Sequence, residues 1–174
     1  MPKKNNVAKA GLGYVVGNYL LKGLSFLTIP IFVRLLSTSD YGIYNTFLAY
    51  ESIFFVIVGF AIHSSFKNAK YKYKEKYEQY VSSSFLLVAI SFLVWFCLAF
   101  AFSKYLVRVM NLDRISIYML ILYSFSTAVI NCVNAYFALN YEYQKFLAIS
   151  AVNAIGNILI SIYLINTVYS SQRY

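Results

Sequence analysis

A lysine within a hydrophobic stretch is the residue of this chain with the clearest capacity for chemistry. Lys22 lies near the middle of an apolar stretch at residues 10–36, where a lysine costs roughly 2.5 to 3.5 kcal/mol on membrane-insertion scales. On a helix, Asn18 and Ser25 stand one turn away on either side, so that one face is polar. We expect this face to contact a substrate or an ion, and the alternative is that Lys22 only neutralises a carboxylate on another helix.

The carboxylate that best fits this alternative is Glu51, in a second apolar stretch at residues 41–66. At the helical rise per residue, Glu51 lies about 15 Å and Lys22 about 21 Å from the outer ends of their helices. These depths are close enough for an interhelical ion pair. We therefore treat Glu51 as a candidate ion-pair partner or ion-coupling residue.

Two later apolar stretches carry uncharged polar faces. At helical spacing, Asn131 and Asn134 share a face of residues 115–139, and Asn153 and Asn157 share a face of residues 146–168. The third stretch, residues 81–103, has no comparable polar stripe. Asparagine and serine also join helices to one another, but polar faces on three helices indicate a shared hydrophilic cavity. The residues that we expect to bind substrate are Lys22, Asn18, Ser25, Asn131, Asn134, Asn153 and Asn157.

Enzyme chemistry is disfavoured by the same survey. The chain has one histidine, His63, and lacks a glycine-rich phosphate loop, paired carboxylates and a nucleophile elbow. Cys97 and Cys132 have no neighbours at metal-ligand spacing and are interpreted as packing residues. We expect no catalytic residue, no metal and no cofactor. A transporter needs none of these, because it binds its substrate near the bilayer midplane and rearranges.

The elements that position these residues are hydrophobic helices. Of the 174 residues, 60% are hydrophobic and 12% are charged, whereas soluble domains have about 25% charged residues. Roughly 20 apolar residues cross a bilayer core as a helix. We therefore expect an all-α membrane protein that forms a single helical unit over residues 1–174, with about five transmembrane helices. The predicted spans are residues 10–36, 41–66, 81–103, 115–139 and 146–168, and Asp40 or Ser39 is expected to cap the second.

Charge distribution predicts the orientation of these helices. The N-terminus and a polar stretch at residues 67–80, expected to be a loop, are rich in lysine, and a shorter basic link is expected at residues 104–114. Because positive loops stay in the cytoplasm, the N-terminus is predicted to be cytoplasmic. The net charge of +9 and the run Lys70-Tyr71-Lys72-Tyr73-Lys74 are also compatible with nucleic-acid binding. A basic loop with interfacial tyrosines explains them more simply, so we expect no nucleic-acid partner.

Two sequence motifs in the first half of the chain resemble a known family. The run GLSFLTIPIFVRLLS at residues 23–37, followed by DYGIY at residues 40–44, resembles the opening signature of bacterial polysaccharide flippases. These proteins move undecaprenyl-pyrophosphate-linked O-antigen or capsule repeat units and belong to the multidrug/oligosaccharidyl-lipid/polysaccharide exporter superfamily. Gly59-Phe60, Ser64-Ser65 and a Lys/Tyr/Glu-rich stretch before Tyr80-Val81-Ser82 also fit.

The resemblance implies a two-lobed exporter in the bacterial inner membrane, of which this chain would form part of one lobe. Lys22 matches a basic residue that related flippases place on the first helix, facing a central cavity, where it would attract the pyrophosphate of a lipid carrier. The implied partners are a lipid-linked oligosaccharide, membrane lipids and, as candidates, a polysaccharide polymerase or glycosyltransferases. Family members have more helices than this chain, which predicts a truncated copy.

Two other functions fit the same residues. A multidrug or cation antiporter of the same superfamily shares the architecture but favours an acidic residue in its cavity, such as Glu51, over Lys22. A small membrane adaptor would use the basic stretch at residues 67–76 to dock anionic lipid or a glycosyltransferase.

Overall fold

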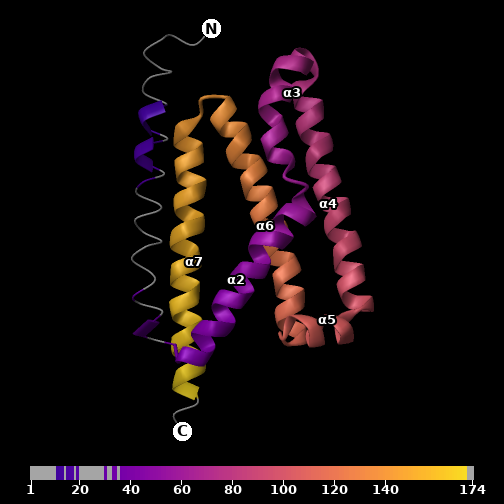
Figure 1. Ribbon diagram of the computed structural model, residues 1–174. Helices are drawn as coiled ribbons and strands as arrows, with labels where there is room; N and C mark the ends of the chain where they lie inside the picture. The colour runs from indigo at the N-terminus through magenta and orange to yellow at the C-terminus, as the bar shows by residue number, and fades with distance from the viewer. Residues whose placement is uncertain are drawn as a thin grey trace. The chain divides into compact units, whose positions relative to one another are not determined.

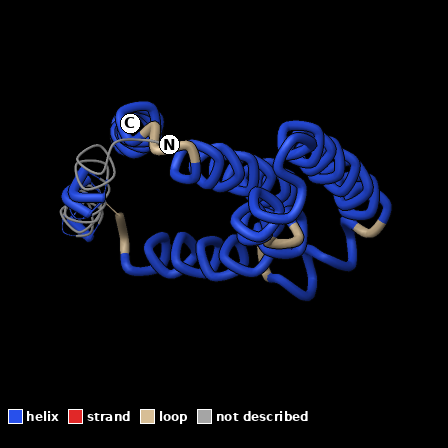
Figure 2. The backbone as a smooth tube through the Cα atoms, turned by 90° about the horizontal axis from the view of Figure 1, so that it is seen from above, coloured by secondary structure: helices blue, strands red, loops and turns tan. Residues whose placement is uncertain are grey.

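The chain folds into helices joined by short turns. The computed structural model describes residues 11–13, 15–17, 19, 30, 33, 34 and 36–171, and their side chains as far as residue 159 except residue 157. All elements of this described part are helical (Figure 2). Three stretches of it are long and apolar enough to cross a membrane, namely Thr38–Gly59, Ile62–Ala101 and Arg114–Leu139. The prediction of an all-α membrane protein is therefore confirmed.

Two compact units make up the chain, one of residues Met1–Gly42 and Asn140–Tyr174, the other of residues Ile43–Leu139. In the first unit, glycines near the N-terminus lie against helix α7 (Tyr143–Ser171). A Cβ atom added to Gly13 would lie 2.6 Å from Cδ2 of Tyr143, and one added to Gly17 would collide with Leu147. Only glycine allows the backbone to approach α7 this closely.

Helix α2 (Thr38–Gly59) begins at a serine cap (Figure 1). The backbone N–H of Asp40 donates a hydrogen bond to Oγ of Ser37 at 3.2 Å, and this hydroxyl donates to Oδ2 of Asp40 at 2.5 Å. The expectation that Asp40 or Ser39 caps the helix is corrected, because Ser37 is the N-cap. Asp40 instead supports the cap from the first helical turn, where its negative charge also favours the helix dipole.

The helical conformation is interrupted after α2, and the chain then continues as further helices. Phe60 and Ala61 both have left-handed backbones, with φ of 50° and 47°, so the stretch expected as one span at residues 41–66 is interrupted here. It continues as η1 (Ile62–Ser65), α3 (Phe66–Tyr73) and η2 (Lys74–Lys76). Residues 67–80, expected to be a loop, are therefore helical. The reason is a buried side of α3, where Phe66 and Ala69 pack against α4 and α6 while Lys67 and Lys72 are exposed.

Helices α4 (Tyr77–Ala101) and α6 (Arg114–Leu139) form the core of the second unit. They run antiparallel, and Phe92 stacks on Phe125 with ring centroids 4.5 Å apart. Helix α5 (Ser103–Met110) joins them and lies across their ends (Figure 1). The link expected at residues 104–114 is thus mainly an amphipathic helix. Met110 and Leu112 are buried under it.

Candidate functional site

Three side chains have a buried polar atom about halfway along the helices of the second unit. Ser124 of α6 is 0% exposed and Ser91 of α4 is 6% exposed. Neither Oγ atom has a hydrogen-bond partner in the described part of the chain, and the same holds for Oε1 of Glu51 on α2. We call these three residues the midplane polar group.

The aromatic pairs place the two serines at the same level. Ser91 and Ser124 directly precede Phe92 and Phe125, which stack on one another. Each serine is about ten residues, or about 15 Å, from the end of its helix next to α5. A bilayer core is about 30 Å thick, so this level corresponds to the middle of the membrane.

Glu51 belongs to the place where α2 crosses α6. Phe47 of α2 contacts Tyr123 of α6, with ring centroids 6.3 Å apart. Farther along α2, a Cβ atom added to Gly59 would lie 2.7 Å from Cβ of Ala128. Figure 1 shows α2 passing obliquely across α6. Since Glu51 lies between these contacts on α2 and Ser124 lies between them on α6, the crossing contains both residues.

Two of the predicted substrate-binding residues are on the same helix as Ser124. Asn131 and Asn134 of α6 are half-buried, and Oδ1 of Asn134 is buried without a hydrogen-bond partner in the described residues. Both asparagines thus lie on a helix of the second unit, and Oδ1 of Asn134 retains hydrogen-bonding capacity. Their binding of substrate stays a prediction.

The other predicted residues are not part of this unit. Asn153 is exposed on α7 of the first unit, and the side chain of Asn157 is not among those described. Lys22, Asn18 and Ser25 lie outside the described residues. The predicted ion pair between Lys22 and Glu51 therefore stays a prediction.

Ser91 and Ser124 are the residues that the sequence analysis missed. The third apolar stretch was interpreted as lacking a polar stripe, but Ser84 and Ser91 of α4 are both buried. Ser84 donates its hydroxyl to the backbone carbonyl of Tyr80 at 2.8 Å, as serine commonly does within helices. Ser91 makes no such bond. The seven-residue spacing of the two serines, two helical turns, is the signal in the sequence that places them on one face.

Polar side-chain contacts lie at the end of the unit opposite to α5. Lys70 of α3 donates to the backbone carbonyl oxygen of Leu139 at 2.6 Å, which satisfies one of the free carbonyls at the end of α6. Its ammonium also lies 5.7 Å from the ring centroid of Tyr77. The hydroxyl of Tyr136 donates to the carboxylate of Glu78, at 3.1 Å to Oε1. These contacts hold α3 and the start of α4 against α6.

The first turn of α6 is fixed by a carboxylate. Asp113 accepts hydrogen bonds from the backbone N–H groups of Ile115 and Ser116, at 3.1 and 3.3 Å, and from the hydroxyl of Ser116. The side-chain hydrogen bond from Ser116, together with the backbone bonds, holds the pKa of this carboxyl below its usual value. Asp113 therefore stays ionised as the N-cap of α6 at neutral pH.

Among the described residues, no group of three or more histidine, cysteine, aspartate or glutamate side chains is suited to hold a metal ion. Cys132 is buried in the cluster around Phe66 and Tyr77, which confirms its interpretation as a packing residue, while Cys97 is exposed on α4. Both cysteines are free thiols.

Several apolar helices long enough to cross a bilayer define a polytopic membrane protein. The sequence profile of the polysaccharide biosynthesis protein family matches residues 7–170, and the chain belongs to that family. No curated protein and no solved structure matches the chain. The protein therefore has a role in polysaccharide biosynthesis, in a membrane.

Proposed function

We propose that this protein helps to move lipid-linked oligosaccharide repeat units across the bacterial inner membrane. The observation that carries the proposal is the midplane polar group, in which Oε1 of Glu51 and the Oγ atoms of Ser91 and Ser124 are buried without partners in the described part of the chain. Buried polar atoms without hydrogen bonds are costly in a hydrocarbon environment and are typical of sites that bind a substrate or an ion. Membership of a polysaccharide biosynthesis family makes a glycan-bearing lipid the substrate that fits best.

The proposed roles divide between charge and hydrogen bonding. Lys22 would attract the pyrophosphate of the lipid carrier, since an ammonium group strengthens each hydrogen bond that it donates to a phosphate oxygen. Asn131 and Asn134, with Asn18, Ser25, Asn153 and Asn157, would exchange hydrogen bonds with sugar hydroxyls. No catalytic step is part of the proposal.

Glu51 is proposed to couple the movement to an ion. A carboxyl group with a buried, unpartnered oxygen gains an interaction when it binds a cation. Cation binding would alter the packing at the crossing of α2 and α6, and this would link ion uptake to the position of α2. Glu51 is also the residue that favours the second candidate function, a multidrug or cation antiporter.

The test is allelic replacement in the gene that encodes this chain, at its own locus. Lys22→Ala should reduce surface polysaccharide about tenfold or more, because a hydrogen bond to a charged group contributes about 1.5 to 3 kcal/mol. Lys22→Arg should retain much of the activity. Lys67→Gln, which removes an exposed positive charge from α3, is the matched control and should leave the polysaccharide unchanged.

The readouts separate the candidate functions. If the protein flips lipid-linked repeat units, these units should accumulate on the cytoplasmic side in Lys22→Ala. Surface polysaccharide at the level of the unmodified strain in this variant would refute the role of Lys22. Loss of drug resistance without any change in surface glycan would favour the antiporter. If Lys22→Ala is silent and removal of the exposed lysines of α3 and η2 displaces a glycosyltransferase from the membrane, the adaptor function is correct.

A cytoplasmic N-terminus is part of the proposal. The lysines of α3 and η2, including Lys67, Lys72 and Lys76, are exposed at one end of the second unit, and the positive-inside rule assigns this end to the cytoplasm. Helix α5 would then face the opposite side of the membrane.

A further inference from the structure

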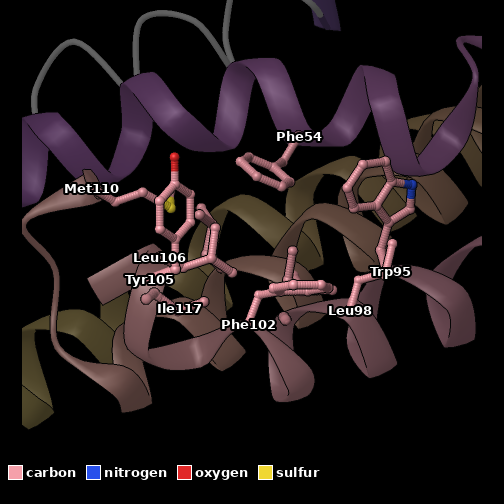
Figure 3. A pocket seen from close by; sticks show the side chains of 11 residues that line it. Phe54, Trp95, Leu98, Phe102, Tyr105, Leu106, Met110 and Ile117 are labelled. Atoms are coloured by element: carbon pink, nitrogen blue, oxygen red, sulfur yellow. The ribbon is translucent and has the colours of Figure 1, made fainter. Parts of the chain in front are cut away.

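An apolar pocket of about 330 Å³ lies under helix α5, at the end of the second unit away from the lysines of α3. Helices α2, α4, α5 and α6 all contribute side chains to its wall. Figure 3 shows Phe54 of α2 directed into the space between Trp95 of α4 and Tyr105 of α5. The residues that line the pocket are all apolar or aromatic, so a polar ligand would lose hydrogen bonds with water on entering it.

Positively charged side chains lie on α5 and at the start of α6, two of the helices that line the pocket. Lys104, Arg108 and Arg114 are exposed, and Lys104 is the direct neighbour of Tyr105 in the pocket wall. The nearby acidic residue in this part of the chain is Asp113, whose carboxylate is already bonded to Ser116 and the first turn of α6. The rim therefore has unneutralised positive charge.

An amphipathic tyrosine connects the apolar pocket to this charged rim. Tyr105 is 66% exposed, and in Figure 3 its ring stands between α5 and α2 as part of the pocket wall. Tyrosine is enriched at the boundary between the hydrocarbon core and the lipid headgroups. Helix α5 is thus placed where headgroups lie, and the pocket is placed where the upper part of an acyl chain lies.

We propose that this pocket binds one acyl chain of an anionic phospholipid of the bilayer, with the headgroup phosphate on Lys104 and Arg108. The apolar wall accounts for the chain, and the positive rim accounts for the preference for an anionic headgroup. The pocket is at the small end of the range of ligand sites, about 300 to 1,000 Å³. This size fits a segment of a single acyl chain better than the much longer polyprenyl chain of a sugar carrier.

The single tryptophan of the chain allows a direct test, because Trp95 lines the pocket. Bromine atoms on acyl chains quench tryptophan fluorescence at short range. The intact protein is reconstituted in phosphatidylcholine vesicles that contain brominated phosphatidylglycerol or, in parallel, an equal fraction of brominated phosphatidylcholine. We expect stronger quenching by the brominated phosphatidylglycerol.

The charge variant Lys104→Gln/Arg108→Gln should remove most of this difference in quenching. We expect each lost cation to lower the preference for the anionic lipid about fivefold. Both side chains are exposed, so these changes leave the packing of the unit intact. The matched control Lys67→Gln/Lys76→Gln removes two exposed charges from the other end of the unit and should retain the difference. Ala99→Phe, which fills the pocket, should reduce quenching by both brominated lipids.

Each contrary result overturns the proposal. Equal quenching by the two lipids, or a difference that survives Lys104→Gln/Arg108→Gln, would exclude recognition of an anionic lipid by α5. Relief of quenching by a small fraction of undecaprenyl phosphate would assign the pocket to the sugar carrier instead. Weak quenching in both vesicles would show that protein fills the pocket, for example a second copy of the chain. None of these results depends on whether the protein flips repeat units.

Discussion

Replacing Gly59 with alanine should destabilise the protein, although alanine normally favours a helix. A Cβ atom at this position would lie 2.7 Å from Cβ of Ala128, whereas carbon atoms in contact are about 3.5 to 4.0 Å apart. Neither atom belongs to a flexible side chain, so α2 and α6 must separate by about 1 Å. Overpacking of this kind costs about 1 to 3 kcal/mol. Backbone strain does not contribute, since the φ angle of Gly59 is not positive.

The matched control for Gly59→Ala is Gly42→Ala, in the same helix. An added Cβ atom at Gly42 meets nothing within 4 Å, so this substitution should stabilise α2 by about 0.5 to 1 kcal/mol through helix propensity. The free energies of unfolding are measured in mixed detergent micelles by titration with sodium dodecyl sulfate, followed by circular dichroism. We expect the two variants to change stability in opposite directions.

A double variant separates steric overlap from any other cause. Ala128→Gly removes the atom that the new methyl group meets, so Gly59→Ala/Ala128→Gly should be more stable than the sum of the single changes predicts, with a coupling energy of about 0.5 to 3 kcal/mol. If Gly59→Ala is as stable as Gly42→Ala, or if the two changes are additive, then the close crossing of α2 and α6 is wrong. The assignment of Glu51 and Ser124 to one crossing would be wrong with it.

Three further predictions concern the two ends of the second unit. Lys70→Ala should lower the free energy of unfolding by about 1.5 to 3 kcal/mol, since it removes the bond to the carbonyl of Leu139, while Lys67→Ala should have little effect on the same titration. The pKa of Asp113 is lowered by Ser116, so the ionised N-cap stabilises the protein above the unfolded-state pKa of about 3.9, and this stabilisation is lost as the pH falls through the lower folded-state pKa. Asp113→Asn should keep the N-cap at pH 7 and flatten the pH dependence of stability between pH 5 and pH 2, which is measured by thermal unfolding at a series of pH values. An unchanged pH profile would contradict the assignment of Asp113 as the N-cap. In a background with Cys97→Ser and Cys132→Ala, a membrane-impermeant maleimide should label Lys104→Cys in intact cells and Lys76→Cys after permeabilisation, and the reverse pattern would invert the proposed topology.

The helical membrane class could be predicted from the sequence because it depends on composition and on the length of the apolar stretches. The predicted third and fourth spans, residues 81–103 and 115–139, overlap closely with α4 and α6. These stretches contain enough apolar residues for their length alone to indicate a crossing. These two spans could therefore be located in the sequence without knowing which helices pack beside them.

The break at Phe60 and Ala61 could not be predicted in the same way. Both residues are apolar, and neither is glycine or proline, so the local sequence contains no signal for a left-handed backbone. Tertiary packing explains it instead, because Gly59 is pressed against Ala128 while Phe66 is fully buried in the next cluster. Likewise, residues 67–76 were expected to be a loop because most of their side chains are polar. The segment is helical because the side of α3 formed by Phe66 and Ala69 is buried.

Identifying the midplane polar group required both the sequence and the packing of the helices. Glu51 was identified from the sequence because a carboxylate in an apolar stretch is rare and costly, whereas a single serine in such a stretch is common and usually bonds to its own helix. Only the packing of α4 on α6 shows that Ser91 and Ser124 lie at one level and lack partners. The break after Gly59 ends α2, so the helix that carries Glu51 is not continuous with α3. Transporters commonly build their substrate and ion sites from discontinuous helices, so the proposed role of Glu51 rests on this break as well as on its unpartnered oxygen.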